Sequence, residues 1–415
     1  MFKDTPEPLV KSGENTAPSV AAGNNTPTGK HKKQDTAKVE GLMQQFPDVV
    51  CLSHLRWDFV YQRPQHLLSR FARHARVFFV EEPVFEHVQV PYLSTCYREG
   101  NLLLAIPHLP HGLQEEEIEA IQHRLLNQLF TEHKVAEHIL WYYTPMALGF
   151  TRHLEPVLTV YDCMDELSAF KFAPPRLKEL EQELFKTADL VFTGGQSLFE
   201  AKQKQHPAVK AFPSSIDKDH FAQAKHTLTP PSDQKDIPAP RLGFFGVIDE
   251  RMDIDLLAAL ADARLDWQLV MIGPVVKIDP ASLPQRPNIH YLGSKSYREL
   301  PAYISGWQVA LLPFALNEST AFISPTKTPE YLAAGKPVVS TPIRDVVRPY
   351  GKEGLIHIAG TAPTFIQAVE AALLQQDNRE WQQKVEAFMQ DMSWDQTWHG
   401  MVELMAEAIQ EKKQV

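Results

Sequence analysis

Short apolar strands and amphipathic helices alternate along most of this chain, and one proline-rich segment interrupts the alternation. Near the start of the pattern, the apolar runs DVVCLS (48–53) and RVFFVEEP (76–83) flank a segment that opens at Pro64 and has apolar residues at helical spacing. Strand, helix and strand in this order form a βαβ unit, whose two strands are parallel. The sequence therefore predicts an α/β protein built on doubly wound parallel sheets.

The alternation divides the chain into two similar regions. The first region has further expected strands at 138–145, 158–166 and 189–195, and helices at 174–188 and 197–205. The second has expected strands at 241–248, 267–274, 289–293, 307–314 and 336–341, and helices at 253–264 and 296–305. Ligands of such sheets bind at the carboxyl ends of the strands, so two facing domains would enclose a cleft.

The segment between the two regions, KHTLTPPSDQKDIPAP (225–240), has four prolines and no periodicity, which is typical of a linker. We therefore expect an N-terminal domain over 47–228, a linker over 229–240 and a C-terminal domain over 241–392.

The two ends of the chain differ in character. Residues 1–46 are rich in Pro, Gly, Asn, Thr and Lys, which predicts a disordered tail. At the other end, Ser393 and Gln396 form a capping-box pattern at the start of a helix expected over 393–413. Its apolar stripe includes Trp394 and Trp398 and needs a large partner surface.

Composition excludes several classes of protein. The formal net charge of -10 argues against a nucleic-acid partner. Cys51, Cys96 and Cys163 have neither disulfide nor zinc-site spacing, which favours a reducing compartment. No signal-peptide pattern or membrane-spanning apolar run is present, so we expect a cytoplasmic protein. The basic stretches 70–76 and 201–210 suit peripheral contact with the inner face of a membrane, and equally a solvated helix face.

The motif ISPTKTPEYLAAGKPVVST (323–341) places Lys327 and Glu330 on one face of a short helix. Free N–H groups at a helix N-terminus attract phosphate, and Lys327 adds a full positive charge there. Glu330 could accept hydrogen bonds from two neighbouring hydroxyls, as carboxylates do when they hold a ribose. An ordinary surface ion pair has the same spacing, so the spacing alone does not decide between the two roles.

KTPEYLAAGKPVVST resembles the nucleotide-sugar signature of GT-B-fold glycosyltransferases of the retaining family 4 type. The segments RLGFFGVID, WQLVMIGP and NIHYLGSKSYRELPAYISGWQVALLPF are similar to the rest of that family's C-terminal domain. SHLRWDFVYQRPQHL and VYDCMDELSAF look like a subgroup that often serves surface polysaccharide assembly. The resemblance implies two Rossmann-like domains facing a cleft, with the C-terminal helix crossing back to the N-terminal domain.

The resemblance also implies where a nucleotide-diphospho-sugar donor would bind. Glu330 would hold the ribose or the donor sugar, and Lys327 and Arg251 would stabilise the diphosphate. The remaining donor-binding residues would be Gly246 and Ser324 through their backbone, and Ile272, Gly273, Tyr291 and Gly293 around the base.

Two departures from the family pattern bear on this site. The family commonly has a second glutamate eight residues before the ribose glutamate, and this chain has Phe322 there; Glu318 does not fit the spacing. The loop GVIDERMDID carries one cation, Arg251, where the family usually has an arginine and a lysine. Lys327 could compensate for the missing charge.

A second cluster, VYDCMDEL, places Asp162 and Asp165 at the end of an expected strand. The family often has a histidine close to the position of Asp162, so an aspartate there could orient an acceptor hydroxyl or accept its proton. We place Asp162 ahead of Asp165 in this catalytic role. Two other readings stay open: helix capping, and a metal site made of hard oxygen ligands. Because GT-B enzymes do not generally need a metal, we expect no metal and no cofactor.

The loop SHLRWDFVYQRP follows the first expected strand and would lie at the cleft. His54, Arg56, Trp57 and Arg63 supply hydrogen-bond donors and an aromatic surface for an acceptor or a phosphate. Simple packing and ion pairing would explain the same residues.

We therefore expect a hexosyltransferase-type glycosyltransferase that moves a sugar from a nucleotide-diphospho-sugar to a sugar or lipid-linked acceptor. A non-catalytic GT-B scaffold that binds a nucleotide or a partner enzyme, and a nucleotide-sugar epimerase, are the alternatives. The motifs leave the base, the sugar and the acceptor open.

Overall fold

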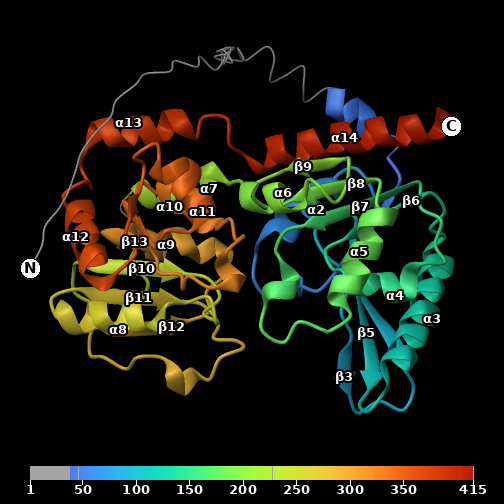
Figure 1. The fold of residues 1–415 in the computed structure, drawn as a ribbon, viewed down its shortest axis with the longest axis horizontal. Helices are drawn as coiled ribbons and strands as arrows, with labels where there is room; N and C mark the ends of the chain where they lie inside the picture. Colours follow the sequence, from blue (N-terminus) through green and yellow to red (C-terminus); the bar gives the residue numbers. More distant parts are fainter. Residues whose placement is uncertain (1–37, 45, 227, 415) are drawn as a thin grey trace, which may run out of the picture.

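The computed structural model describes residues 38–44, 46–226 and 228–414. These residues form two α/β lobes that lie side by side (Figure 1). The N-terminal lobe contains a nine-stranded sheet and the C-terminal lobe a six-stranded sheet. The predicted GT-B architecture, with two Rossmann-like domains facing each other, is confirmed.

The sheet of the N-terminal lobe has the strand order β3-β5-β2-β1-β6-β7-β8-β9, and β4 pairs with β5. Its strands are β1 (Asp48–Ser53), β2 (Val77–Glu81), β3 (Val84–Glu86), β4 (Tyr92–Tyr97), β5 (Leu102–Pro110), β6 (His138–Tyr142), β7 (Leu158–Cys163), β8 (Leu190–Thr193) and β9 (Val209–Ala211). Its helices are α2 (Arg63–Phe71), α3 (Glu115–His133), α4 (Leu148–Thr151), α5 (Leu177–Thr187) and α6 (Gln196–Lys202). The next helix, α7 (Lys218–Ala222), belongs to the C-terminal lobe, because its Phe221 is buried in the core of that lobe.

Both faces of this sheet are covered, and β1 shows why its sequence is apolar throughout. Val49 and Cys51 belong to the core on one face of the sheet, whereas Val50 and Leu52 belong to the core on the other face. A strand that is buried on both faces reads as a continuous apolar run. The exception to the predicted parallel pairing is β4, which is antiparallel to β5.

The sheet of the C-terminal lobe has the order β12-β11-β10-β13-β14-β15, and all its pairings are parallel. Its strands are β10 (Arg241–Phe245), β11 (Gln268–Ile272), β12 (Ile289–Gly293), β13 (Val309–Leu312), β14 (Val338–Ser340) and β15 (His357–Ile358). Its helices are α8 (Ile254–Ala263), α9 (Leu300–Ser305), α10 (Lys327–Ala333), α11 (Arg344–Val346), α12 (Ala362–Leu373) and α13 (Arg379–Phe388).

The last helix, α14 (Trp394–Gln414), leaves the C-terminal lobe and lies along the N-terminal lobe (Figure 1). Trp394 and Trp398 are buried in the same core as Phe71 of α2. The expected crossover helix is therefore present, and its tryptophans pack against the N-terminal lobe, which is the large partner surface that the apolar stripe needs.

The expected N-terminal tail needs correction, and the expected linker makes contacts that the sequence did not reveal. Residues 38–43 are helical, and Val39 and Met43 are buried in the core beside α14, so order begins before the expected end of the tail at residue 46. The expectation for 1–37 lies outside the described residues. The proline-rich connection is also anchored: the Gln234 side chain is fully buried and accepts a hydrogen bond from Trp307 Nε1 at 2.8 Å.

Candidate functional site

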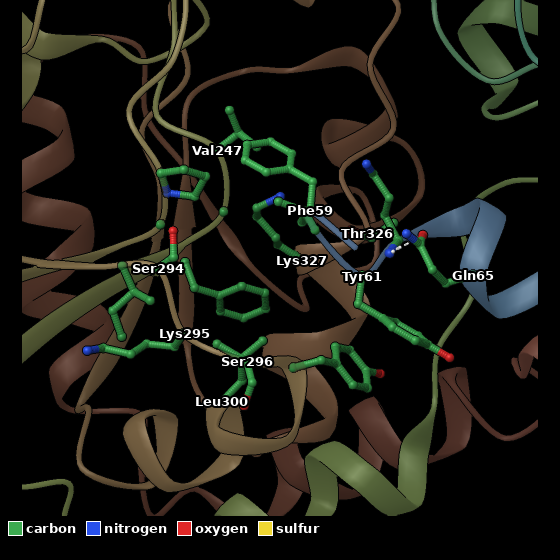
Figure 2. A pocket seen from close by; sticks show the side chains of 18 of the residues that line it. Phe59, Tyr61, Gln65, Val247, Ser294, Lys295, Ser296, Leu300, Thr326 and Lys327 are labelled. Carbon is green, nitrogen blue, oxygen red and sulfur yellow. Dashed lines mark hydrogen bonds between the residues drawn. The ribbon is translucent and has the colours of Figure 1, made fainter. Parts of the chain in front are cut away.

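A cavity of about 380 Å³ lies between the two lobes. On the C-terminal side it is bounded by the ends of β10 and β11, by the loop after β12 and by α10. The strand order reverses between β10 and β13, and ligands of doubly wound sheets bind at such a reversal. In Figure 2, Ser294, Lys295 and Ser296 border one side, Tyr61 and Gln65 of the N-terminal lobe lie opposite, and Lys327 lies between them.

Two glycines allow the backbone to form the floor of this cavity. Gly246 and Gly273 follow β10 and β11 and have φ values of 138° and 143°, which L-residues with side chains rarely adopt. A Cβ on Gly273 would lie 1.9 Å from the carbonyl oxygen of Gly246. The predicted residues Gly246, Ile272 and Gly273 all line the cavity.

Helix α10 presents Lys327 and Glu330 to the cavity. It begins at Lys327 and is followed by Gly335 at φ 70°, a conformation that commonly ends a helix. Glu330 is 5% exposed, and its Oε2 has no hydrogen-bond partner among the described residues. Burial raises the pKa of Glu330 and lowers the pKa of Lys327, and each shift is opposed by the charge of the other residue.

An unpartnered buried carboxylate oxygen is costly unless a further group pairs with it. At Glu330 this oxygen belongs to a residue that lines an open cavity, so a hydroxyl of a bound molecule could satisfy it. Lys327 and Glu330 thus lie together at a cavity, where Glu330 is buried and Lys327 is half-buried, and not on an exposed surface as an ordinary ion pair would.

Tyr297 adds a wall that the sequence interpretation missed. Its ring stacks on Tyr61 of the N-terminal lobe with 4.6 Å between centroids, and both residues line the cavity. The Tyr297 hydroxyl is buried without a partner in the described part of the chain. Burial, together with the charge of Glu330, raises the Tyr297 pKa. No sequence motif indicates a role for Tyr297, because Tyr297 and Tyr61 are distant in sequence and come together only in the folded protein.

Only two of the four predicted base-binding residues, Ile272 and Gly273, line the cavity. Tyr291 and Gly293 do not line the cavity, and the Tyr291 hydroxyl donates to the carbonyl of Pro284 at 3.2 Å. Gly293 supports the floor indirectly, because its carbonyl accepts from the N–H of Gly273 at 2.9 Å. The next residues along the chain take their place at the wall: Ser294, Lys295, Ser296 and Tyr297.

A smaller cavity of about 90 Å³ shares Arg251 and Lys327 with the first one. Asp165 and Ser324 also line it, one from each lobe. Burial raises the pKa of Asp165 to about 6, against the opposing charges of Arg251 and Arg63. A carboxyl group with this pKa can exchange a proton near neutral pH.

The preference for Asp162 over Asp165 is corrected by the structure. Asp162 is 0% exposed, and both of its carboxylate oxygens accept hydrogen bonds from the equally buried Arg63 at 2.8–3.1 Å. Arg63 Nη1 also donates to the carbonyl of Phe212 at 2.8 Å. The pair ties α2 to β7 and β9, so neither charge is available to an acceptor. Arg63 lines the smaller cavity but not the large one.

Arg251 is also less available than predicted. Its guanidinium makes hydrogen bonds of 2.7–3.1 Å to both oxygens of Asp249. The same group lies 5.4 Å from the ring centroid of Phe170, which comes from the other lobe. Asp249 neutralises much of its charge, so Lys327 is the better candidate for balancing an anionic ligand.

The predicted residues of the first loop of the N-terminal lobe differ in their surroundings. Trp57 lines the large cavity, as predicted for an acceptor-facing residue. Arg56 instead pairs with Glu81 at 2.9 Å and with the carbonyl of Pro83. His54 follows β1; its Nδ1 is buried with no partner among the described residues, and burial lowers its pKa to about 4.

Phe322 and Asp345 connect the lobes outside the cavity. Phe322, which occupies the position of the missing glutamate, packs against the core of the N-terminal lobe. Asp345 of the C-terminal lobe accepts a hydrogen bond from the backbone N–H of Ser197 at 2.9 Å. The residue that departs from the family pattern thus contributes to the contact between the lobes.

The described residues offer neither a cluster of metal ligands nor a membrane-spanning helix. Nowhere in residues 38–44, 46–226 and 228–414 do three or more His, Cys, Asp or Glu side chains gather in a way that could hold a metal ion. Over the same part of the chain, each helix is too short or too polar to cross a membrane.

Parts of the sequence are similar to known glycosyltransferases. Residues 239–375 match the family model described as glycosyl transferases group 1. The putative teichuronic acid biosynthesis glycosyltransferase TuaH of Bacillus subtilis (strain 168) is 27% identical over 161 residues. That match covers 37% of this chain and 40% of the length of TuaH.

Solved structures with low sequence identity share the fold across most of the chain. A structure from E. coli described as trehalose-6-phosphate bound with UDP-2-fluoro glucose has a TM-score of 0.61 at 12% identity and covers 88% of this chain and 99% of its own. Sucrose-phosphate synthase from Thermosynechococcus elongatus has a TM-score of 0.64 at 12% identity and covers 88% and 100%. WaaG, a glycosyltransferase involved in lipopolysaccharide biosynthesis, has a TM-score of 0.56 at 13% identity and covers 86% and 99%. The fold is therefore GT-B, and residues 239–375 match the group 1 glycosyl transferases.

Proposed function

We propose that this protein is a glycosyltransferase that transfers a sugar from a nucleotide-diphospho-sugar to a hydroxyl acceptor in polysaccharide or glycoconjugate assembly. One observation carries the proposal: Glu330 offers an unpartnered buried carboxylate oxygen beside Lys327, in a cavity at the strand-order reversal between two GT-B lobes. The family match over this lobe and the similarity to TuaH support it.

In the proposed reaction, the bond between the anomeric carbon and the diphosphate oxygen breaks, and a bond from that carbon to the acceptor oxygen forms. Lys327 and backbone N–H groups near Gly246 would stabilise the charge that develops on the departing diphosphate. Glu330 would fix the donor by accepting hydrogen bonds from its hydroxyls. The floor of Gly246 and Gly273 would let the donor approach the backbone closely.

Asp165 is our candidate for the group that receives the proton of the acceptor hydroxyl. It lines the smaller cavity together with Lys327, and its raised pKa suits proton exchange. Retention of configuration follows from the resemblance to family 4 and is part of the proposal. Contact between the lobes through Tyr61 and Tyr297 would help to keep water, which hydrolyses donors, out of the site.

The test is an assay of donor binding, donor hydrolysis and sugar transfer with UDP-, GDP-, ADP- and TDP-sugars. Glu330→Ala should weaken donor binding, whereas Asp165→Ala should keep binding and lose turnover. Glu318→Ala is the matched control, because Glu318 is an exposed acid on the same segment. Turnover that is unchanged in both Glu330→Ala and Asp165→Ala would contradict the proposal.

A scaffold that binds nucleotide without catalysis is the second candidate, favoured by Phe322 in place of an acid and by the engagement of Arg251 with Asp249. Under that function, Glu330→Ala would lose nucleotide binding, and neither hydrolysis nor transfer would appear with any donor and acceptor.

A further inference from the structure

The N-terminal lobe contains a second large cavity that the proposed donor site does not use. Its volume is about 370 Å³, and it lies at the carboxyl ends of β1 and β2, beside α3 and α4. Its interior is formed mainly by apolar side chains: Leu52, Val80, Ile118, Met146, Ala147 and Phe150. Its size falls within the range of ligand-binding cavities.

Several charged groups at the edge of this apolar cavity are already paired. Arg176 donates to Glu115 at 2.7 Å and to Glu119 at 3.0 Å. Glu81 accepts from Arg56 at 2.9 Å. A sugar or phosphate needs free polar partners, whereas this cavity offers mainly aliphatic surface and the arginine at its rim, Arg176, is already paired. The lining therefore favours an aliphatic chain as the ligand.

One hydrogen bond and one loop link the apolar cavity to the proposed reaction site. Trp57, which lines the cavity between the lobes, donates its backbone N–H to Glu81, which lines the apolar cavity, at 2.7 Å. One loop also connects the two sites: it begins at Asp165 in the smaller cavity and reaches the apolar cavity at Pro174 and Pro175. A molecule long enough to reach past this loop could occupy both sites.

Two exposed aromatic residues belong to segments that contribute to the apolar cavity. Phe85 lines the cavity and is 40% exposed. Phe172, in the connecting loop, is 78% exposed and has a φ of 67°, a conformation that costs free energy for a non-glycine residue. Large apolar side chains exposed on the segments that form an apolar cavity suit a ligand that arrives from a lipid phase.

We propose that this apolar cavity binds the aliphatic chain of a lipid-linked acceptor, which places the acceptor sugar near Asp165. The inference rests on the proposed function, because it names the class of acceptor for the same reaction. It assigns an apolar chain to residues of β1, β2, α3 and α4 that have no part in donor binding.

The test measures the binding of n-alkyl β-D-glucosides with chains of six to ten carbons, each below its micelle concentration, to the full chain. Because burial of each methylene is favourable, affinity should rise about fourfold per added methylene until the cavity is full. Ile118→Trp fills the cavity and should remove this dependence on chain length. Leu265→Trp is the matched control, because Leu265 is exposed on the C-terminal lobe, and it should retain the dependence.

If thermal melting shows that Ile118→Trp does not fold, Ile118→Gln replaces it, and the same loss of chain-length dependence is expected. Affinity that is independent of chain length, or equal in the wild type and the folded Ile118 variant, overturns the inference. Chain-dependent binding without sugar transfer to any acceptor would support the apolar site and contradict the proposed function. Transfer to soluble sugars that is as efficient as transfer to alkyl glucosides would contradict only the inference.

Discussion

The side chain of Lys327 lies directly over Gly246: a Cβ at position 246 would stand 2.1 Å from Lys327 Cε and 2.7 Å from its Nζ. The Lys327 side chain can therefore take this position only because residue 246 has no Cβ. This contact brings a positive charge to the end of the strand where a donor diphosphate is proposed to lie.

Gly246→Ala should displace the Lys327 side chain and weaken binding of nucleotide sugars. Overpacking of this kind typically costs about 1–3 kcal/mol of unfolding free energy, to which the φ of 138° adds strain. The double variant Gly246→Ala/Lys327→Ala should recover the steric part of the stability but not donor binding. Urea unfolding and titration calorimetry measure the two effects.

Gly112→Ala is the control for the backbone term, because Gly112 also has a positive φ and nothing lies within 4 Å of its added Cβ. If Gly246→Ala lost no more stability or donor affinity than Gly112→Ala, the close contact between Gly246 and Lys327 would not matter for folding or donor binding.

The two aspartates after β7 should separate stability from activity. Asp162→Asn removes the charged partner of the buried Arg63 and should cost about 3–5 kcal/mol of unfolding free energy. Asp165→Asn removes a carboxyl group that folding holds at a raised pKa, so it should not destabilise the protein at pH 7 and should reduce transfer. Urea unfolding of both variants, with transfer assayed in parallel, compares them. An Asp165→Asn enzyme with full activity would contradict the role given to Asp165.

The raised pKa of Asp165 also predicts a dependence of stability on pH. The folded protein holds this proton up to a pKa of about 6, whereas the unfolded chain releases it near the ordinary value of 3.8. Between these values the native state binds more protons than the unfolded state, so the contribution of Asp165 to stability falls as pH rises. The unfolding free energy of Asp165→Asn relative to wild type should therefore increase from pH 4 to pH 6.5.

The same carboxyl group should shape activity. If ionised Asp165 accepts the proton, transfer should rise with pH through about 6 in the wild type. If the transfer rate of the wild type did not rise with pH in this range, proton transfer to Asp165 would be contradicted.

Phe322→Glu would restore the family's acidic residue to a position that packs on the N-terminal lobe here. We expect it to lower the melting temperature rather than to improve donor binding, because a carboxylate would replace an apolar contact between the lobes. Phe322→Leu keeps the apolar contact and should change little. Tighter donor binding by Phe322→Glu without loss of stability would show that the missing glutamate, and not lobe contact, limits this site.

Several parts of the fold could be predicted because they depend on local pattern. The buried strands β1, β2, β10 and β11 are continuous apolar runs, and parallel α/β sheets leave few alternatives for such runs. The antiparallel β4 has an exposed face and polar residues, so periodicity did not reveal it. The helical residues 38–43 were hidden in a polar tail, and their burial of Val39 depends on α14 from the other end of the chain.

The candidate site was predictable only where its residues share a motif. Lys327 and Glu330 belong to one short segment and were found together. Whether Asp162 or Asp165 faces the cavity depends on Arg63, which is 99 residues from Asp162 in sequence. Tyr297 meets Tyr61 only through the packing of the two lobes, and no local signal announces that contact.

Titration of the protein with nucleoside diphosphate sugars, followed by thermal unfolding, tests the central claim most directly. A ligand at one hundred times its dissociation constant should add about 2.7 kcal/mol to the unfolding free energy. The account predicts that at least one of the UDP-, GDP-, ADP- and TDP-sugars does so for the wild type and for Lys352→Ala, an exposed lysine control. It also predicts that Lys327→Ala and Glu330→Ala lose most of this gain. Two results would contradict the account. One is a ligand-induced stabilisation of the Lys327→Ala and Glu330→Ala variants that equals that of the wild type. The other is a wild type that none of the four donors stabilises.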